Sequence, residues 1–150
     1  PVLVGAGHPF RKGGHIPELP EELLTQFDFI DLNGKDIAEN RQRTENLSYV
    51  LGEKLHKPVV AGSDTHQAVQ YGCIRTDFEK DFDTFEELQK EMNAGRYTIC
   101  IHPDAAFKVK TAALLKRSLK EIHALGGDYV SVLLRQSGES AAVQAIKKAV

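Results

Sequence analysis

The sequence predicts an α/β protein with a mainly parallel sheet. Short apolar runs rich in β-branched residues alternate along the chain with longer segments of helical periodicity, and glycine or proline stands between them. Such alternation is typical of parallel sheets and barrels, because a helix returns the chain to the edge from which the next strand starts. With 150 residues, 41% of them hydrophobic and 27% charged, the chain is expected to build one core.

The first part of the chain predicts two strands with a short helix between them. Residues 2–5 are a β-branched apolar run that ends in glycine, which predicts a buried strand. Residues 17–27 place leucines among glutamates, which predicts a helix reached through the Gly13-Gly14 loop. The run Phe-Ile-Asp-Leu at 29–32 predicts the second strand.

The middle of the chain continues the alternation. Between residues 37 and 55 apolar side chains recur at roughly helical spacing, and Pro58 ends this helix. The run 59–61 then predicts a third strand, and a short extended segment is expected around 72–74.

The remaining elements alternate in the same way. Residues 84–94 predict a helix that Gly95 ends. The elements expected after it are a strand at 97–101, a long helix from Asp104 to Leu125, a strand at 129–134 and a helix at 141–149. Residues 1–103 are expected to form the main domain, and residues 104–150 a helical extension packed on it.

Composition limits the class of protein. No apolar run is long enough to span a membrane, and the amino terminus lacks the basic region and long apolar core of a signal peptide, so the chain is expected to be cytoplasmic. Cys73 and Cys100 are interpreted as buried free thiols, because two cysteines without a repeated spacing make no disulfide framework. The net charge is −2, but the segment from Asp104 onward is basic. A basic segment can favour a polyanion, although a solvated helix face is the commoner explanation.

Asp64 and His66 directly follow the third predicted strand. The carboxyl ends of parallel strands face one rim, so residues placed just after strands gather there. In an extended segment residues two apart point to the same side, so these two side chains can direct a carboxylate and an imidazole at one point. That pair suits zinc, manganese or iron. The alternative is that Asp64 only caps the next turn.

His8 follows the first predicted strand and is therefore expected at the same rim. A single histidine beside a proline is usually a polar residue satisfied by nearby backbone, so its candidacy depends on convergence with Asp64 and His66. Arg11 begins a flexible basic loop, and its guanidinium could bind a phosphate through two donors. A solvent-exposed loop without function fits equally well. His15, in the same loop, is a further candidate ligand or acid/base.

Two other polar groups follow predicted strands. Asn33, Lys35 and Asp36 follow the second predicted strand and are expected at the same rim, although a tight turn at Asn33-Gly34 is favoured. His102-Pro103 repeats the arrangement of a strand followed by His-Pro, with Cys100 two residues earlier. Because no second pair completes four zinc ligands, His102 and Cys100 are interpreted as structural.

Together, these motifs resemble the later motifs of the PHP (polymerase and histidinol phosphatase) family. The string Gly62-Ser63-Asp64-Thr65-His66 is the most specific part of the resemblance, which covers roughly residues 1–103. The other shared residues are Gly7-His8-Pro9-Phe10-Arg11, Asn33-Gly34, Asn40, Tyr71-Gly72 and Thr76.

The resemblance implies a distorted (β/α)7 TIM-like barrel that binds up to three divalent ions and hydrolyses phosphoesters. It implies that His8, Asp64 and His66 are metal ligands, with Asp64 and His66 as the catalytic pair. It makes Arg11 a candidate contact to the substrate phosphate. Zinc, manganese or iron would be the cofactor, and the substrate would be a small phosphoester or a nucleic-acid end.

The family's first motifs, a His-x-His pair followed by further His and acidic ligands, have no counterpart in these 150 residues. The chain is therefore expected to be the carboxyl-terminal half of a metal-dependent phosphoester hydrolase, carrying part of the metal site and weak or inactive alone. A half-barrel leaves an open strand edge, which a homodimer or the extension could cover. The alternative is a non-catalytic fragment or degenerate module that acts as a scaffold or binds a partner or polyanion.

Overall fold

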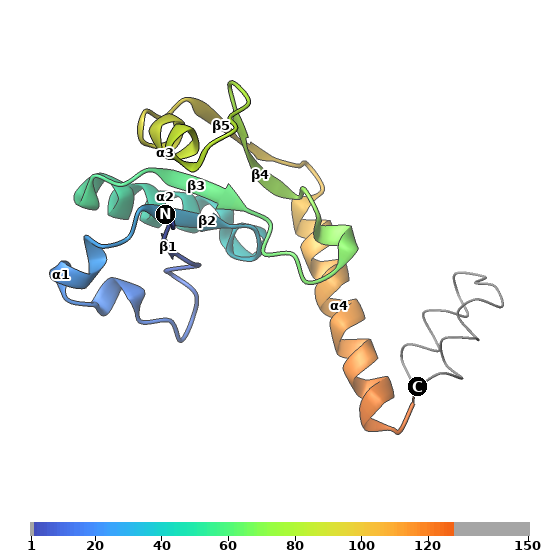
Figure 1. Ribbon diagram of the computed structural model, residues 1–150. Helices are drawn as coiled ribbons and strands as arrows, with labels where there is room; N and C mark the ends of the chain where they lie inside the picture. The colour runs from blue at the N-terminus through green and yellow to red at the C-terminus, as the bar shows by residue number, and fades with distance from the viewer. Residues whose placement is uncertain (1, 128–150) are drawn as a thin grey trace, which may run out of the picture. The chain divides into compact units, whose positions relative to one another are not determined.

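The computed structural model describes residues 2–127 (Figure 1). The chain divides into two compact units, and the division falls between Ala112 and Ala113. The first unit holds a three-stranded sheet and a two-stranded sheet, so the fold is mixed α/β, as predicted. The strand expected at 129–134 and the helix expected at 141–149 lie outside the described residues. The expected packing of residues 104–150 on the first domain stays a prediction.

The three-stranded sheet is parallel, with the strand order β1-β2-β3. Its strands are β1 (Gly5–Ala6), β2 (Phe29–Asn33) and β3 (Val59–Gly62). The predictions for β2 and β3 are confirmed, but β1 is shorter and later than predicted. The reason is that the Val4 N–H donates to the Asp28 side-chain carboxylate and the Val4 carbonyl accepts from the Asp28 N–H, before β2 begins, and Val2 is 75% exposed.

The connection from β1 to β2 differs from the single helix predicted at 17–27. It contains the 3-10 turn η1 (Ile16–Glu18) and the four-residue helix α1 (Glu21–Leu24). Pro20 separates the two, because a proline inside a helix lacks the N–H that the helix needs.

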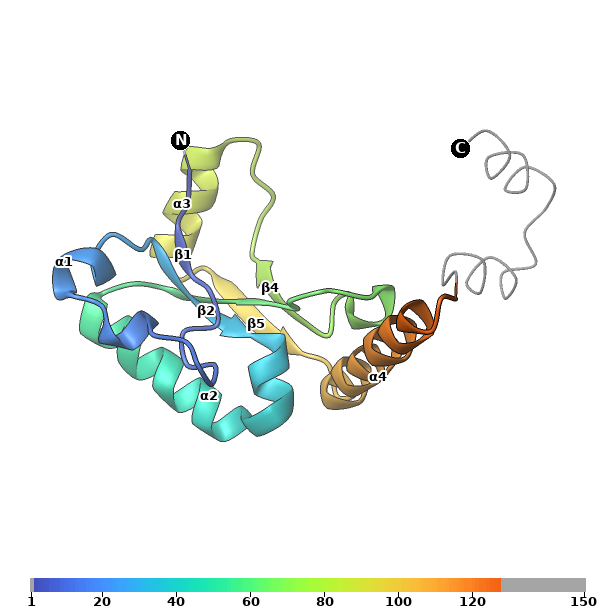
Figure 2. The ribbon, with the colours of Figure 1, turned by 90° about the horizontal axis from the view of Figure 1, so that it is seen from below.

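The helix α2 (Gly34–Leu55) connects β2 to β3 and lies against both strands (Figure 2). It is kinked at Asn40, whose φ of −156° and ψ of 91° are not helical. The Asn40 side chain accepts a hydrogen bond from the Arg43 N–H at 3.1 Å and so starts the helix again. The fully buried Ile30 and Leu32 of β2 belong to a core that also includes Leu51 and Leu55 of α2.

The second sheet pairs β4 (Ile74–Phe78) with β5 (Tyr97–Ile101) in antiparallel orientation. The helix α3 (Phe85–Asn93) lies in the connection between these strands. The Glu79 N–H donates to the Arg96 carbonyl, so the unit is a hairpin with α3 at its tip rather than a parallel crossover. This arrangement corrects the expectation that the strands continue one parallel barrel, and the described residues form no closed barrel.

The Thr76 side chain makes contacts between the two sheets of the first unit. Before β4 stands the 3-10 turn η2 (Ala68–Gln70). Within β4, the Thr76 hydroxyl accepts from the Ala61 N–H at 2.7 Å and lies 3.1 Å from the Ala61 carbonyl. It therefore satisfies both backbone groups of a β3 residue that a ladder would otherwise pair.

The last described helix, α4 (Ala105–Ala124), ends before Gly126, which adopts a φ of 78°. Its first turns bury Ala105, Val109 and Ala112. Among the helices of the described chain, none combines the length and the apolar character that a membrane crossing requires.

Candidate functional site

The carboxyl edge of the parallel sheet brings together polar residues from all three strand ends. His8 follows β1, Asn33 ends β2, and Asp64 stands two residues beyond β3. His8 and Asp64 have positive φ values of 38° and 50°. A residue with a side chain adopts this region at a cost of roughly 1–2 kcal/mol, so the surrounding contacts must hold both turns.

Arg11 is the centre of the contacts at this edge. Its Nη2 donates to Asp64 Oδ2 at 2.9 Å and to Asn33 Oδ1 at 2.6 Å, and its Nε donates to Asp36 Oδ1 at 3.0 Å. Arg11 thus ties the loop after β1 to the end of β2, the first turn of α2 and the turn after β3. Burial alone would raise the pKa of Asp64, but the hydrogen bond and charge of Arg11, with His66 and Asn33, hold it below its ordinary value.

Asn33 is part of this network and not of a tight turn, which corrects the favoured interpretation. It is 3% exposed, and its Oδ1 accepts from the Lys35 N–H at 2.9 Å as the N-cap of α2. The first residue of α2 is Gly34, and there is no room for a side chain at this position. A Cβ there would lie 2.7 Å from Ile74 Cγ2 and 3.0 Å from the Ser63 carbonyl oxygen.

Asp31 is a site residue that the sequence reasoning missed. Its Oδ2 accepts from the His8 N–H at 3.0 Å and from Asn33 Nδ2 at 3.1 Å. Burial raises the pKa of Asp31 and nearby Asp64 adds to the rise, while the two hydrogen bonds offset part of it. The available signal was the Asp-x-Asn at the end of β2, because residues two apart on a strand, such as 31 and 33, point to the same side of the sheet.

His66 is held in an orientation that suits a metal ligand. Its Nδ1 lies 2.9 Å from the Asp64 carbonyl oxygen, and since a carbonyl only accepts, Nδ1 carries the proton and Nε2 keeps its lone pair. Metal-binding histidines are usually fixed in this way. Oδ1 of Asp64 lies 3.7 Å from the same ring nitrogen, so the carboxylate and the imidazole stand side by side.

The carboxylate of Asp64 and the imidazole of His66 are donor types that a divalent ion accepts. Within residues 2–127, however, no group of three or more His, Cys, Asp or Glu side chains is arranged to hold a metal ion. His8 reaches the same edge, and its backbone is anchored on Asp31. The three-ligand set of His8, Asp64 and His66 stays a prediction.

The other residues singled out in the sequence lie apart from this network. His15 Nδ1 is 3.0 Å from Glu18 Oε2, and both side chains are exposed. His102 Nδ1 accepts from the Asp104 N–H at 3.0 Å, so its lone pair is already used. Cys100 is free and half-buried, and its hydrogen bond to Asp77 raises the pKa of the thiol. Cys73 is free and buried, as predicted.

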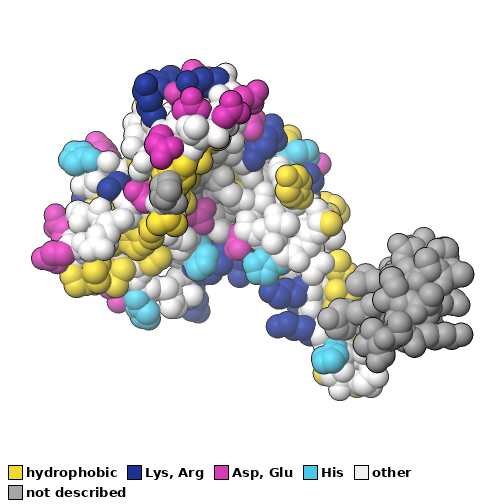
Figure 3. All heavy atoms as spheres, viewed as in Figure 1, with side chains coloured by type: hydrophobic (Ala, Val, Ile, Leu, Met, Phe, Trp, Pro, Cys, Tyr) yellow, Lys and Arg dark blue, Asp and Glu magenta, His cyan; other side chains and the backbone are white. Residues whose placement is uncertain are grey.

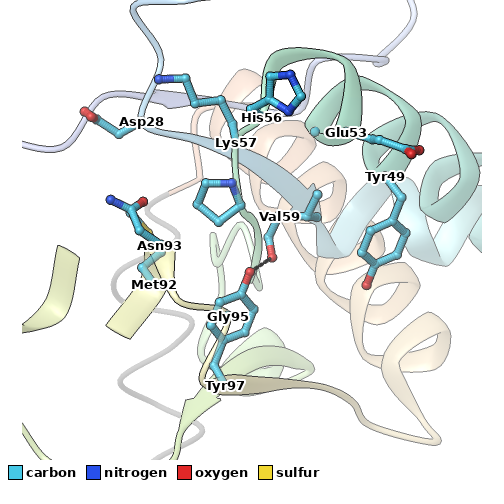
Figure 4. Close-up of a pocket in the computed structure, with 12 residues that line it drawn as sticks. Asp28, Tyr49, Glu53, His56, Lys57, Val59, Met92, Asn93, Gly95 and Tyr97 are labelled. Atoms are coloured by element: carbon cyan, nitrogen blue, oxygen red, sulfur yellow. Dashed lines mark hydrogen bonds between the residues drawn. The ribbon is translucent and has the colours of Figure 1, made fainter. Parts of the chain in front are cut away.

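A cavity of about 650 Å³ lies at the opposite, amino edge of the sheet (Figure 4). Asp28 and Val59, at the starts of β2 and β3, line it together with the end of α2, and Tyr97 donates from its hydroxyl to the Val59 carbonyl at 2.7 Å. The cavity therefore lies at the amino edge of the sheet, whereas the hydrogen-bonded polar residues lie at the carboxyl edge. The carboxyl edge is the better candidate, because its polar side chains are oriented by one another.

Comparison with known proteins supports the resemblance read from the sequence. Residues 46–97 match the family model PHP_C, described as PHP-associated, which confirms a likeness to the carboxyl-terminal region of PHP proteins. No curated protein matches the chain. The crystal structure of PsfC from Pseudomonas syringae PB-5123 matches with a TM-score of 0.57 and 23% identity over 77% of this chain. The chain spans 45% of PsfC, and at this identity the match shows a shared fold alone.

Proposed function

We propose that this chain is the carboxyl-terminal part of a PHP-type, metal-dependent phosphoester hydrolase and carries part of its metal site. The Asp64–His66 pair is the observation that supports this most. The pair stands just beyond the end of the parallel strand β3, and the hydrogen bond of His66 Nδ1 to the Asp64 carbonyl leaves Nε2 as a ligand atom.

Each residue at this edge has a role in the proposal. Asp64 and His66, with His8, would hold zinc, manganese or iron, and a bound ion would supply a Lewis acid and an activated water. Nε and Nη2 of Arg11 donate hydrogen bonds to Asp36, Asn33 and Asp64, while Nη1 donates to no residue that the structure describes. Nη1 is therefore the donor that Arg11 can offer to a substrate phosphate. A small phosphoester and a nucleic-acid end both carry such a group.

The first test is the metal content of the purified chain after dialysis against zinc or manganese. We expect wild type to retain metal and Asp64→Ala/His66→Ala to lose it. His102→Ala/Asp104→Ala is the matched control, because it removes the same two residue types from a pair whose imidazole lone pair is already used. Equal metal content in all three proteins would contradict the proposal.

The second test is hydrolysis of p-nitrophenyl phosphate and bis(p-nitrophenyl) phosphate by the protein encoded by the complete gene. We expect metal-dependent release of nitrophenol that Asp64→Ala abolishes. The chain itself is expected to show little or no release. Hydrolysis that persists in the chelator-treated protein or in Asp64→Ala would contradict a metal-dependent reaction at this edge.

A second candidate function is a non-catalytic module that binds a polyanion, and the exposed cations of α4 favour it. Lys116, Arg117 and Lys120 form no ion pair with the residues that the structure describes. Binding to duplex DNA would weaken with salt by a slope of about −0.9 per phosphate contact. Replacing these three cations by alanine should then lower the slope by roughly 2–3. Replacing Arg43, Lys54 and Lys90, which removes the same charge, should not.

A further inference from the structure

The contacts of Arg11 place Asp64 between a guanidinium and an imidazole. Arg11 touches Asp64 through Oδ2, and His66 stands on the side of Oδ1. The charge of Arg11 is balanced by Asp36, which is 8% exposed and accepts from Nε at 3.0 Å. Arg11 can therefore orient the carboxylate without presenting an uncompensated positive charge to a cation nearby.

Gln70 holds the backbone of the same turn. It is 5% exposed, and its Oε1 accepts from the His66 N–H at 2.8 Å and from the Gln67 N–H at 3.1 Å. Its Nε2 donates to the Asp64 carbonyl at 3.4 Å. The left-handed turn at Asp64 is thus fixed on its backbone side by Gln70 and on its side-chain side by Arg11.

We propose that Arg11 is a positioning residue for the Asp64–His66 pair, in addition to any contact it makes with a phosphate. By holding Oδ2 it keeps the carboxylate beside the imidazole and strengthens divalent-ion binding by the pair. This inference rests on the proposed function. Hydrogen-bonding partners of metal ligands typically account for 10- to 100-fold in metal affinity, which sets the size of the effect.

The test is a Mn²⁺ titration of the chain, followed by paramagnetic broadening of the His66 ring signals in NMR spectra. This readout reports weak binding and needs no enzymatic activity. We expect Arg11→Met to raise the Mn²⁺ concentration for half-broadening by about 10- to 100-fold. Arg11→Lys should restore part of the affinity, because one ammonium cannot span the three acceptors.

Two further variants separate positioning from charge and folding. Arg43→Met removes an exposed arginine of α2 and should leave the titration unchanged. Asp36→Asn keeps Arg11 and loosens its anchor, so it should lower Mn²⁺ affinity in the same direction by a smaller factor. If Arg11→Met fails to fold, the Mn²⁺ affinity of Asp36→Asn tests the inference in its place, and an affinity equal to that of wild type would contradict it.

Two results would overturn the inference, and only the second would also overturn the proposed metal site. If wild type broadens and Arg11→Met broadens at the same or lower Mn²⁺ concentration, Arg11 does not position the pair, while the proposed metal site stands. If the His66 signals of wild type do not broaden at any Mn²⁺ concentration, the proposed metal site fails and the inference fails with it.

Discussion

The two edges of the parallel sheet differ in how their polar side chains are satisfied. At the carboxyl edge, Arg11 bonds to residues of three other elements, and Asp31 anchors the turn after β1. At the amino edge, Glu53, His56 and Lys57 line a cavity of about 650 Å³ without hydrogen bonds between their side chains in the part of the chain that the structure describes. The two edges therefore differ in the mutual orientation of their polar groups, and this orientation, rather than cavity volume, is the basis for choosing the carboxyl edge as the candidate site.

Two glycines of α2 allow the edges to be disturbed separately, and we expect the largest effects there. A Cβ at Gly34 would meet Ser63, next to Asp64, whereas a Cβ at Gly52 would lie 2.8 Å from Val59 Cγ2 and 2.9 Å from the Lys57 carbonyl oxygen. Gly34→Ala and Gly52→Ala should each lower the free energy of unfolding by about 1–3 kcal/mol in urea titrations.

The same pair of variants tests where the site lies. Gly34→Ala should weaken the Mn²⁺ broadening of His66, because it displaces Ser63, while Gly52→Ala should leave it unchanged. Weaker broadening of His66 in Gly52→Ala alone would contradict the assignment of the site to the carboxyl edge.

Glu91, on the α3 segment that borders the cavity, provides a pH-dependent comparison. It is 2% exposed, Lys80 pairs with it at 3.0 Å, and Arg96 forms two further contacts, one of 2.8 Å. Figure 3 shows positive and negative side chains interleaved over α3 and β5. The hydrogen bonds from Arg96 outweigh burial and, with Lys80, lower the pKa of Glu91 from 4.5 to about 2.

The stabilisation by Glu91 is therefore present above pH 4.5 and is lost as the pH falls toward 2. We expect Glu91→Gln to reduce the melting temperature at pH 6, and the difference from wild type to shrink between pH 4.5 and pH 2. Mn²⁺ binding should not change. A difference that is constant with pH would mean that the carboxylate charge contributes nothing.

Tyr97→Phe should have a smaller effect at the amino edge. It removes the hydrogen bond to the Val59 carbonyl, and we expect a loss of about 0.5–1.5 kcal/mol in urea denaturation. Tyr71→Phe is the control, because Tyr71 is 82% exposed. Equal effects of both variants would contradict this account.

His56→Gly should give the smallest change and the opposite sign. His56 ends α2 with a φ of 53°, a conformation that glycine adopts without strain. We expect the free energy of unfolding to rise by about 1 kcal/mol. A decrease would show that the His56 side chain makes a stabilising contact at the cavity.

The sequence predicted the elements well where hydrophobic period and stop signals agree. The strand at 97–101 is confirmed with its bounds, and the helix predicted at 84–94 is α3 (Phe85–Asn93), which Thr84 caps. The direction of β5 could not be predicted, because periodicity does not say whether a helix crosses over a sheet or lies at the tip of a hairpin. The bounds of β1 were also predicted wrongly. The apolar run at 2–5 is present, but Val4 forms its hydrogen bond with Asp28, outside the pairing of β1 with β2.

The candidate site was predicted in part. Asp64, His66 and Arg11 do meet at one edge, which follows from strand direction. The two-residue period does not explain the Asp64–His66 pair, because Asp64 is not extended and has a φ of 50°. The hydrogen bond from Arg11 to Asp36 could not be foreseen, because the two residues lie 25 positions apart in the sequence. Asp31, which accepts from His8 and Asn33, was interpreted only as part of a buried strand. Contacts between elements, rather than motifs, determine these roles.

The hydrogen bonds of His66 and His102 make the two imidazoles chemically different. In neutral His66 the nucleophilic nitrogen is Nε2 on a half-exposed ring, whereas in neutral His102 it is Nδ1, already engaged by the Asp104 N–H. An acylating reagent such as diethyl pyrocarbonate should therefore modify His66 before His102, so His102 serves as an internal standard for the reactivity of His66.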